Sequence, residues 1–306
     1  MTSLQPLDAF FASVNRVMLG KESVVRLAAT ALLARGHVLL EDVPGVGKTL
    51  LARALARGMD LEFQRIQFTS DMMPADILGV TLFNQVRQEF EFVRGPFFTH
   101  VLLADEINRA TPKTQSALLE AMQEGAVSLD RRRHRLPEPF FVLATQNPLE
   151  FSGTFPLPES QLDRFSLRLS IGYPDAAVER ALLKAGDMEP ALELMTPGLD
   201  REGLLGLQRQ AAEVHLSDKI LRYLHAILEA LRADRKILLG PSPRAGIQLA
   251  RCARAHALIG HRSFVTPDDV LALVRPVLAH RMMSRDPVLA IGDAIEEIAE
   301  SVPVPV

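Results

Sequence analysis

The fold is decided by the stretch Pro44-Gly45-Val46-Gly47-Lys48-Thr49. A short apolar run, His37-Val38-Leu39-Leu40, comes before it, and apolar residues at helical spacing follow it over residues 49–57. A strand, a glycine-containing loop and a helix in this order aim many backbone N–H groups at one point, where a lysine adds positive charge. The stretch is therefore predicted to bind phosphate groups.

The loop has the side chains that a nucleoside triphosphate needs. Lys48 is expected to reach the β- and γ-phosphates, and the hydroxyl of Thr49 is expected to coordinate Mg²⁺. The strict pattern G-x-x-x-x-G-K-[ST] is incomplete because Asp42 occupies the position of its first glycine, so a generic glycine turn is the alternative. The residues predicted to contact ATP are Val43, Pro44, Gly45, Val46, Gly47, Lys48, Thr49 and Leu50.

Two further polar groups follow strand-like apolar runs. Asp105 and Glu106 come directly after residues 98–104, and Asn147 follows the apolar run over residues 140–145. The carboxyl ends of parallel strands face the ligand crevice, so these side chains are expected near the phosphate loop. Asp105 is predicted to hold Mg²⁺ through its water shell, and Glu106 to polarise the attacking water. Asn147 is predicted to position that water.

Strands that alternate with helices predict an α/β fold, a P-loop NTPase core with a mostly parallel sheet flanked by helices. Two hairpins are expected within it, at about residues 81–92 and 126–135. Strand signals stop after residue 175, and a smaller all-α lid domain is predicted to follow. The predicted domains are residues 1–174 and 175–306. The expected helices of the second are 176–184, 217–232, 243–259 and 267–279.

Composition limits the partners and the setting. The net charge of −3 gives no overall attraction to nucleic acid or to an anionic membrane. The single cysteine, Cys252, cannot form an internal disulfide, and the N-terminal residues lack the pattern of a signal peptide. No apolar stretch approaches the roughly 20 residues of a membrane span. We therefore expect a cytoplasmic protein without membrane insertion.

With these motifs in place, the chain resembles the AAA+ ATPases, and within them the MoxR family, over nearly its full length. The acidic residue at position 42 fits this family, in which that position is often acidic. The resemblance rests on residues 39–49 (LLEDVPGVGKT), 105–110 (DEINRA), 144–148 (ATQNP) and 161–165 (QLDRF).

The resemblance implies roles for three residues. It makes Asn147 the sensor-1 residue, Arg164 the arginine finger and Arg244 the sensor-2 residue. A finger stabilises charge on the phosphoryl group of the neighbouring subunit's nucleotide, so a homo-oligomer, most often a hexameric ring, is implied. Arg244 would contact the γ-phosphate and couple hydrolysis to domain movement. Arg109 and Arg168 are weaker candidates for the finger.

The resemblance also implies a biological role. It implies Mg²⁺-dependent ATP hydrolysis coupled to chaperone-like remodelling or maturation of a client protein or complex, including metal-centre or cofactor insertion. A protein with a von Willebrand factor A domain is the implied partner. The segment at residues 17–20 resembles the adenine-pocket stretch, and the two hairpins resemble inserts that face the central channel of such rings and touch the substrate there.

Two alternatives to this function stay open. The dense basic run at residues 131–135 (RRRHR) could bind phosphates in a nucleic-acid-dependent motor or loader. No aromatic residues interleave with it to stack bases, so a solvated tip or a contact with a neighbouring subunit is favoured. A non-hydrolysing nucleotide switch would need only the binding residues, and the full set with Asp105, Glu106, Asn147 and Arg164 argues against it. The scattered histidines show no metal-ligand spacing, so Mg²⁺ is the only metal expected.

Overall fold

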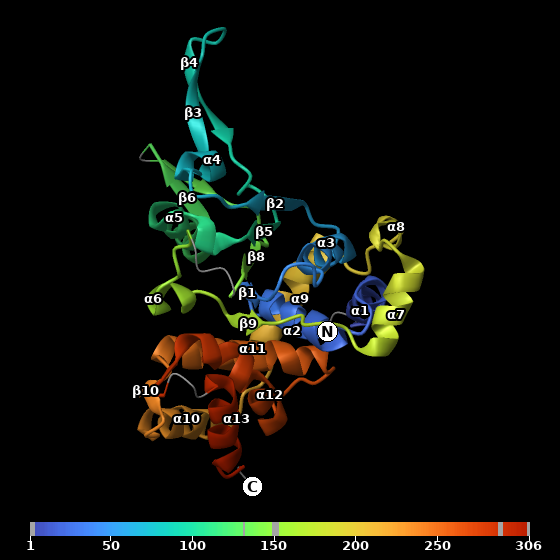
Figure 1. Ribbon diagram of the computed structural model, residues 1–306, viewed down its shortest axis with the longest axis vertical. Coiled ribbons are helices and arrows are strands. Elements are labelled where there is room, and N and C mark those ends of the chain that lie inside the picture. Colours follow the sequence, from blue (N-terminus) through green and yellow to red (C-terminus); the bar gives the residue numbers. More distant parts are fainter. Residues whose placement is uncertain (1–3, 131, 149–152, 287–289, 305–306) are drawn as a thin grey trace.

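A five-stranded parallel sheet forms the centre of the protein (Figure 1). The computed structural model describes residues 4–130, 132–148, 153–286 and 290–304. The sheet order is β2-β5-β8-β1-β9. The bounds of its strands are Phe63–Gln67 for β2, Val101–Asp105 for β5, Phe141–Gln146 for β8, Val38–Glu41 for β1 and Leu167–Leu169 for β9. The three strands in the middle of this order are the three that the sequence predicts.

Alternation along the central strands divides their side chains between two apolar clusters. Val38 and Leu40 of β1 belong to one cluster, and Leu39 between them belongs to the other. The same alternation holds in β5 and β8. The first cluster includes residues of the helices α1 (Gln5–Val17), α2 (Glu22–Leu33) and α3 (Lys48–Gly58), and the second includes residues of α5 (Pro112–Glu124). Helices therefore cover both faces of the sheet.

Two hairpins extend from the sheet domain at the positions expected from the sequence. One joins β3 (Gly79–Asn84) to β4 (Glu89–Arg94) and projects away from the body, at the top of Figure 1. It follows the short helix α4 (Pro74–Leu78). The other joins β6 (Ala126–Leu129) to β7 (Arg132–Arg135). Arg131, the first residue of the basic run, lies outside the described residues.

The second half of the described chain is mainly helical, as predicted. A short helix α6 (Glu159–Leu162) precedes β9, and a two-stranded sheet of β10 (Ile237–Leu239) and β11 (Met283–Ser284) adds to the helices, which the sequence did not predict. The predicted helices are α7 (Ala176–Ala185), α10 (Asp218–Ala233), α11 (Pro243–Ile259) and α12 (Pro267–Leu278). The helical elements that were not predicted are α8 (Glu189–Glu193), α9 (Arg201–Glu213), α13 (Ile291–Ser301) and the 3₁₀ turn η2 (Ala279–Arg281).

The helices α10 to α13 form a layer at the lower end of the molecule in Figure 1. The first apolar cluster continues from α1 and α2 through α9 into α11 and α12, so this layer shares a continuous core with the sheet domain. The predicted boundary at residue 174 falls in the segment that leads from β9 into α7, and it stays a prediction. Within the described ranges, no helix is long and apolar enough to cross a membrane.

Candidate active site

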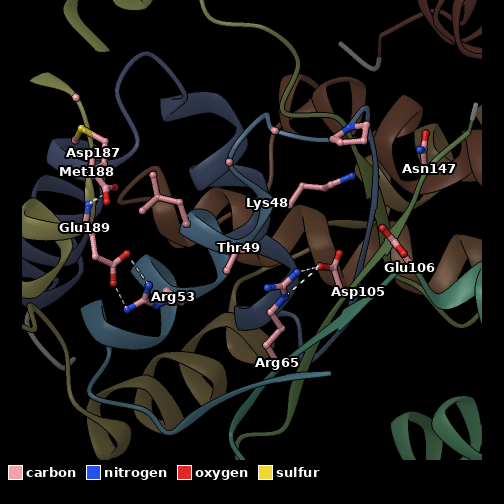
Figure 2. A pocket seen from close by; sticks show the side chains of 15 residues that line it. Lys48, Thr49, Arg53, Arg65, Asp105, Glu106, Asn147, Asp187, Met188 and Glu189 are labelled. Atoms are coloured by element: carbon pink, nitrogen blue, oxygen red, sulfur yellow. Dashed lines mark hydrogen bonds and ion pairs between the residues drawn. The ribbon is translucent and has the colours of Figure 1, made fainter. Parts of the chain in front are cut away.

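A pocket of about 540 Å³ lies where β1, β5 and β8 end (Figure 2). The phosphate loop and the start of α3 form one side of it, and the polar residues at the ends of β5 and β8 form another. Its lining comprises Pro44, Gly45, Gly47, Lys48, Thr49, Leu50, Arg53, Arg65, Asp105, Glu106, Asn147 and residues 186–189. The structure thus brings Lys48, Thr49, Asp105, Glu106 and Asn147 together, as expected.

The phosphate loop needs glycine at two positions. Gly45 and Gly47 have φ angles of +87° and +98°, a region in which side chains are strained. A Cβ atom at either residue would meet no other atom within 4 Å, so backbone conformation is the reason for glycine. Lys48 begins α3, and its Nζ donates to the backbone carbonyl of Asp42 at 2.8 Å. The lysine is therefore held across the loop.

Asp42 has a structural role that explains the broken glycine pattern. Its Oδ2 accepts hydrogen bonds from the Ser170 hydroxyl at 3.1 Å, from the Ile171 amide and from the Gly172 amide at 3.1 Å. The side chain of Lys21 donates to the carbonyls of the same segment, including that of Ile171 at 2.6 Å. A glycine at position 42 would remove the acceptor that fixes the chain after β9 to the phosphate loop.

Thr145 links the two acidic residues at the end of β5, Asp105 within the strand and Glu106 directly after it. Its hydroxyl donates to Oδ1 of Asp105 at 2.6 Å and accepts from the Glu106 amide at 2.8 Å. The other oxygen of Asp105 accepts from Nη2 and Nε of Arg65 at 2.6 and 3.1 Å. Arg65 lies on β2 and Thr145 on β8, so the carboxylate of Asp105 is held by groups from both neighbouring strands. Thr145 is fully buried.

The backbone of Glu106 is in the left-handed region, with φ of +57°. This region is conformationally unfavourable for a residue other than glycine, and residues held in it are often found at functional sites. One carboxylate oxygen of Glu106 lies 3.1 Å from Nη1 of Arg109. The strained turn and this ion pair fix the direction of the Glu106 side chain at the edge of the pocket.

Sequence reasoning missed four charged residues of the pocket: Arg53, Arg65, Asp187 and Glu189. Arg53 on α3 forms a two-pronged ion pair with Glu189 at the start of α8, with N–O distances of 2.5 and 2.7 Å (Figure 2). This pair closes one side of the pocket. The position of Arg53, one turn after Thr49 on the same helix, was the available signal for it. Arg65 lies on an edge strand that the sequence did not predict, and no local signal marks it.

The oxygen donors in the pocket fit a Mg²⁺ ion. A threonine hydroxyl and one carboxylate are ligands of the hard type that Mg²⁺ prefers, and phosphate oxygens and waters commonly complete its six ligands. In the described part of the chain, no group of three or more His, Cys, Asp and Glu side chains could hold a metal by itself. Thr49 and Asp105 therefore suit an ion that arrives with a nucleotide.

The predicted arginines lie elsewhere. Arg164 is half-buried in the turn after α6, and Arg244 is in the first turn of α11, and neither lines the pocket. Nε of Arg244 is 3.7 Å from Oδ2 of Asp163, the residue before Arg164. Arg168 on β9 pairs with Glu41 at 3.1 Å. The roles assigned to Arg164 and Arg244 stay predictions.

The remaining expectations concern the adenine side of the pocket and the phosphate loop. Val17 and Met18 are buried in the first apolar cluster and do not line the pocket. Val46 is half-buried and does not line the pocket either. Their predicted nucleotide contacts, like that of Val43, stay predictions. Residues 186–189 also line the pocket, and Glu189 in this segment pairs with Arg53 of α3.

Comparison with known proteins identifies the family. Residues 37–167 match the family described as "ATPase family associated with various cellular activities (AAA)", and residues 229–301 match its lid domain. The chain is 40% identical to the chaperone MoxR1 of Mycobacterium tuberculosis over 90% of this chain and 75% of that protein. The chain belongs to the MoxR family of AAA+ ATPases.

Two further comparisons agree with membership of the MoxR family. The uncharacterised protein YeaC of Bacillus subtilis is 47% identical over 96% of this chain and 93% of its own length. The crystal structure of a candidate ATPase from Cytophaga hutchinsonii superposes with a TM-score of 0.89 at 34% identity, and covers 98% of this chain and 94% of that one. The MoxR fold expected from the sequence, a P-loop core with a helical lid, is confirmed.

Proposed function

We propose that this protein hydrolyses ATP in a Mg²⁺-dependent reaction, and that it does so as a ring of identical subunits, six by family precedent. The observation that carries the proposal is the convergence of Lys48, Thr49, Asp105, Glu106 and Asn147 on one pocket. Membership of an ATPase family and the chaperone name of one relative support it.

Each of these side chains has a task that its position allows. Lys48 leaves the Asp42 carbonyl and contacts the β- and γ-phosphates, which the helix end also attracts. Thr49 and Asp105 hold Mg²⁺, which supplies charge neutralisation on the phosphate oxygens. Glu106 accepts a proton from the attacking water, and Asn147 orients that water. The presence of Glu106 beside the phosphate loop supports hydrolysis over a purely binding role, because a carboxylate there can act as a general base.

The arginines complete the proposed site from a second subunit. Arg164 and Arg244 do not line their own subunit's pocket, and Nε of Arg244 lies 3.7 Å from the carboxylate of Asp163, the residue before Arg164. A guanidinium at the γ-phosphate stabilises the charge of the transition state. In the proposed ring, Arg164 of one subunit serves as the finger for its neighbour's ATP, and Arg244 acts on that same nucleotide.

We further propose that the ATPase cycle remodels or matures a client protein in the cytoplasm, in some cases during insertion of a metal or cofactor, with a von Willebrand factor A domain protein as partner. The β3–β4 hairpin supports a client-binding role because large apolar side chains on it are exposed. These residues are Leu82, Phe83, Val86, Phe90 and Val93.

A nucleic-acid-dependent motor is the second candidate, favoured by the exposed basic side chains of β7. The contacts that β7 makes within the protein argue against this second candidate. Arg133 pairs with Glu124 at 3.1 Å, and the His134 ring packs against Phe92 with centroids 4.0 Å apart. The aromatic partner thus joins the two hairpins. Stimulation of ATPase activity by DNA or RNA at low salt, lost on neutralisation of Arg132 and Arg133, would support the motor instead.

The Glu106→Gln variant tests the proposed mechanism. It should bind ATP with wild-type affinity and lose turnover by about 10²–10⁴-fold, the range for removal of a general base. Undiminished hydrolysis would reject the assignment. Glu124→Gln is a matched control because Glu124 is an exposed glutamate of α5 that does not line the pocket. The Glu106→Gln variant with ATP bound can also be used to capture interacting proteins, which tests the partner proposal. Recovery of a von Willebrand factor A domain protein is the expected result.

A further inference from the structure

The turn that carries Arg164 is attached to the lid on both sides of that residue. Before it, the carboxylate of Asp163 is approached by three lid side chains: Ser242 Oγ at 3.5 Å, Arg244 Nε at 3.7 Å and Arg281 Nη1 at 3.5 Å. After it, the backbone carbonyl of Phe165 accepts hydrogen bonds from Arg281 Nη2 and from His280 Nε2. Side chains of the lid therefore contact the chain at residues 163 and 165, on both sides of Arg164.

Arg281 is the residue that joins both attachments. It ends the 3₁₀ turn η2, after α12, and its side chain is only 2% exposed. One Nη atom faces the Asp163 carboxylate and the other donates to the Phe165 carbonyl. The ring of Phe165 is fully buried in the second apolar cluster, on the sheet side of the turn. The turn is thus fixed to the sheet by a side chain and to the lid by a guanidinium.

Burial of the Arg281 guanidinium at this position carries a free-energy cost. Desolvation of a charge costs several kcal/mol, and an apolar residue of similar volume is often as stable or more so. The burial lowers the pKa of Arg281 to about 10, so the side chain still carries its charge at neutral pH. Arginine can hold the carbonyl and the carboxylate at once because its planar fork presents separate donors in fixed directions.

We propose that Arg281 is a positioning residue for the arginine finger: by holding Asp163 and the Phe165 carbonyl, it fixes the direction of Arg164 toward the neighbouring subunit's nucleotide. The lid of one subunit thereby controls hydrolysis in the next, through a contact distinct from that of Arg244 with nucleotide. This inference rests on the proposed function, because it takes Arg164 as the finger.

The Arg281→Met variant tests the proposal in assembled rings. Methionine fills the space without the fork, so the variant should bind ATP with wild-type affinity and unchanged KM while kcat falls about 10-fold or more. Arg275→Met is the matched control: Arg275, on α12, pairs with Asp293 and Glu296 at the lid surface, away from residues 163–165, and its loss should leave kcat unchanged. Asp163→Asn is a second test variant, and its kcat should fall in the same direction.

Mixed rings separate positioning from general damage. Lys48→Ala subunits cannot hydrolyse ATP but present an intact finger, so mixing them with Arg281→Met subunits should restore turnover above the sum of the two proteins alone. Hydrogen–deuterium exchange gives a readout that does not depend on activity or on ring assembly. Exchange over residues 161–166 should rise in Arg281→Met and stay at the wild-type level in Arg275→Met.

The outcomes distinguish this inference from the function on which it rests. If Arg164→Ala keeps wild-type turnover, the finger assignment itself is wrong. If Arg164→Ala is inactive while Arg281→Met keeps wild-type kcat and wild-type exchange over residues 161–166, only the role of Arg281 is overturned. Loss of activity in Arg281→Met that intact-finger subunits do not rescue, with unchanged exchange in the turn, overturns it as well.

Discussion

Arg65 on β2 and Asp105 on β5 form an ion pair at the edge of the nucleotide pocket, with Nη2 and Oδ2 2.6 Å apart (Figure 2). Asp105 is the residue expected to hold Mg²⁺ through water. A cation beside a metal-binding carboxylate repels the incoming ion and occupies one of its oxygens. We therefore expect the pair to weaken the uptake of Mg²⁺ at this site.

Replacement of Arg65 by alanine should tighten Mg²⁺ binding. The Arg65 side chain is 47% exposed, so the pair is worth about 1 kcal/mol, which corresponds to roughly a 5-fold lower half-saturating Mg²⁺ concentration. The measurement is a Mg²⁺ titration with fluorescent ADP, because ADP lacks the γ-phosphate that Arg65 could also contact. Arg65→Lys keeps the charge and should stay close to wild type. An unchanged or higher half-saturation in Arg65→Ala would contradict the prediction.

Replacement of Asp42 should destabilise the protein rather than weaken ATP binding. The Asp42→Ala variant loses three hydrogen bonds to the carboxylate but keeps the backbone carbonyl that accepts from Lys48. The net contribution of a hydrogen bond to stability is about 1 kcal/mol, so the loss of three should lower the free energy of unfolding by roughly 3 kcal/mol. Urea denaturation measures this loss, and ATP titration should give a near wild-type Kd.

Ser170→Ala is the partial control for Asp42, because it removes one donor and leaves the two amides in place. It should cost about 1 kcal/mol in the same denaturation experiment. Equal stabilities of Asp42→Ala and the wild type would show that the contact with residues 170–172 does not hold the phosphate loop in place.

The central strands could be predicted from the sequence because both of their faces are buried. Strands β1, β5 and β8 lie inside the sheet, so they read as continuous apolar runs. The edge strand β2 is Phe-Gln-Arg-Ile-Gln, with three polar residues in five, and β9 is only three residues long. Neither gives a run long enough to separate it from a loop.

The site could be predicted where its residues are close in sequence. The phosphate loop and the start of α3 are contiguous, and the positions of the polar residues at the ends of β5 and β8 follow from strand order alone. Arg53 and Glu189 are 136 residues apart, and Arg65 and Asp105 are 40 apart. These contacts depend on how α8 and β2 pack, which periodicity does not specify, so both pairs emerged only from the structure.

Buried His37 should make the protein less stable in mild acid. Desolvation lowers the pKa of His37 to about 4, while the unfolded chain keeps a value near 6.5, so only the unfolded state gains the proton as the pH falls between these values. The cost between pH 7 and pH 5 is about 2 kcal/mol of unfolding free energy. Buried His280, whose pKa desolvation also lowers, adds to the same trend.

His37→Gln can keep the bonds to the Met122 carbonyl and the Val142 amide without titrating. Urea denaturation at both pH values should therefore show a loss about 2 kcal/mol smaller in His37→Gln than in wild type, and equal losses would mean that His37 does not control acid stability.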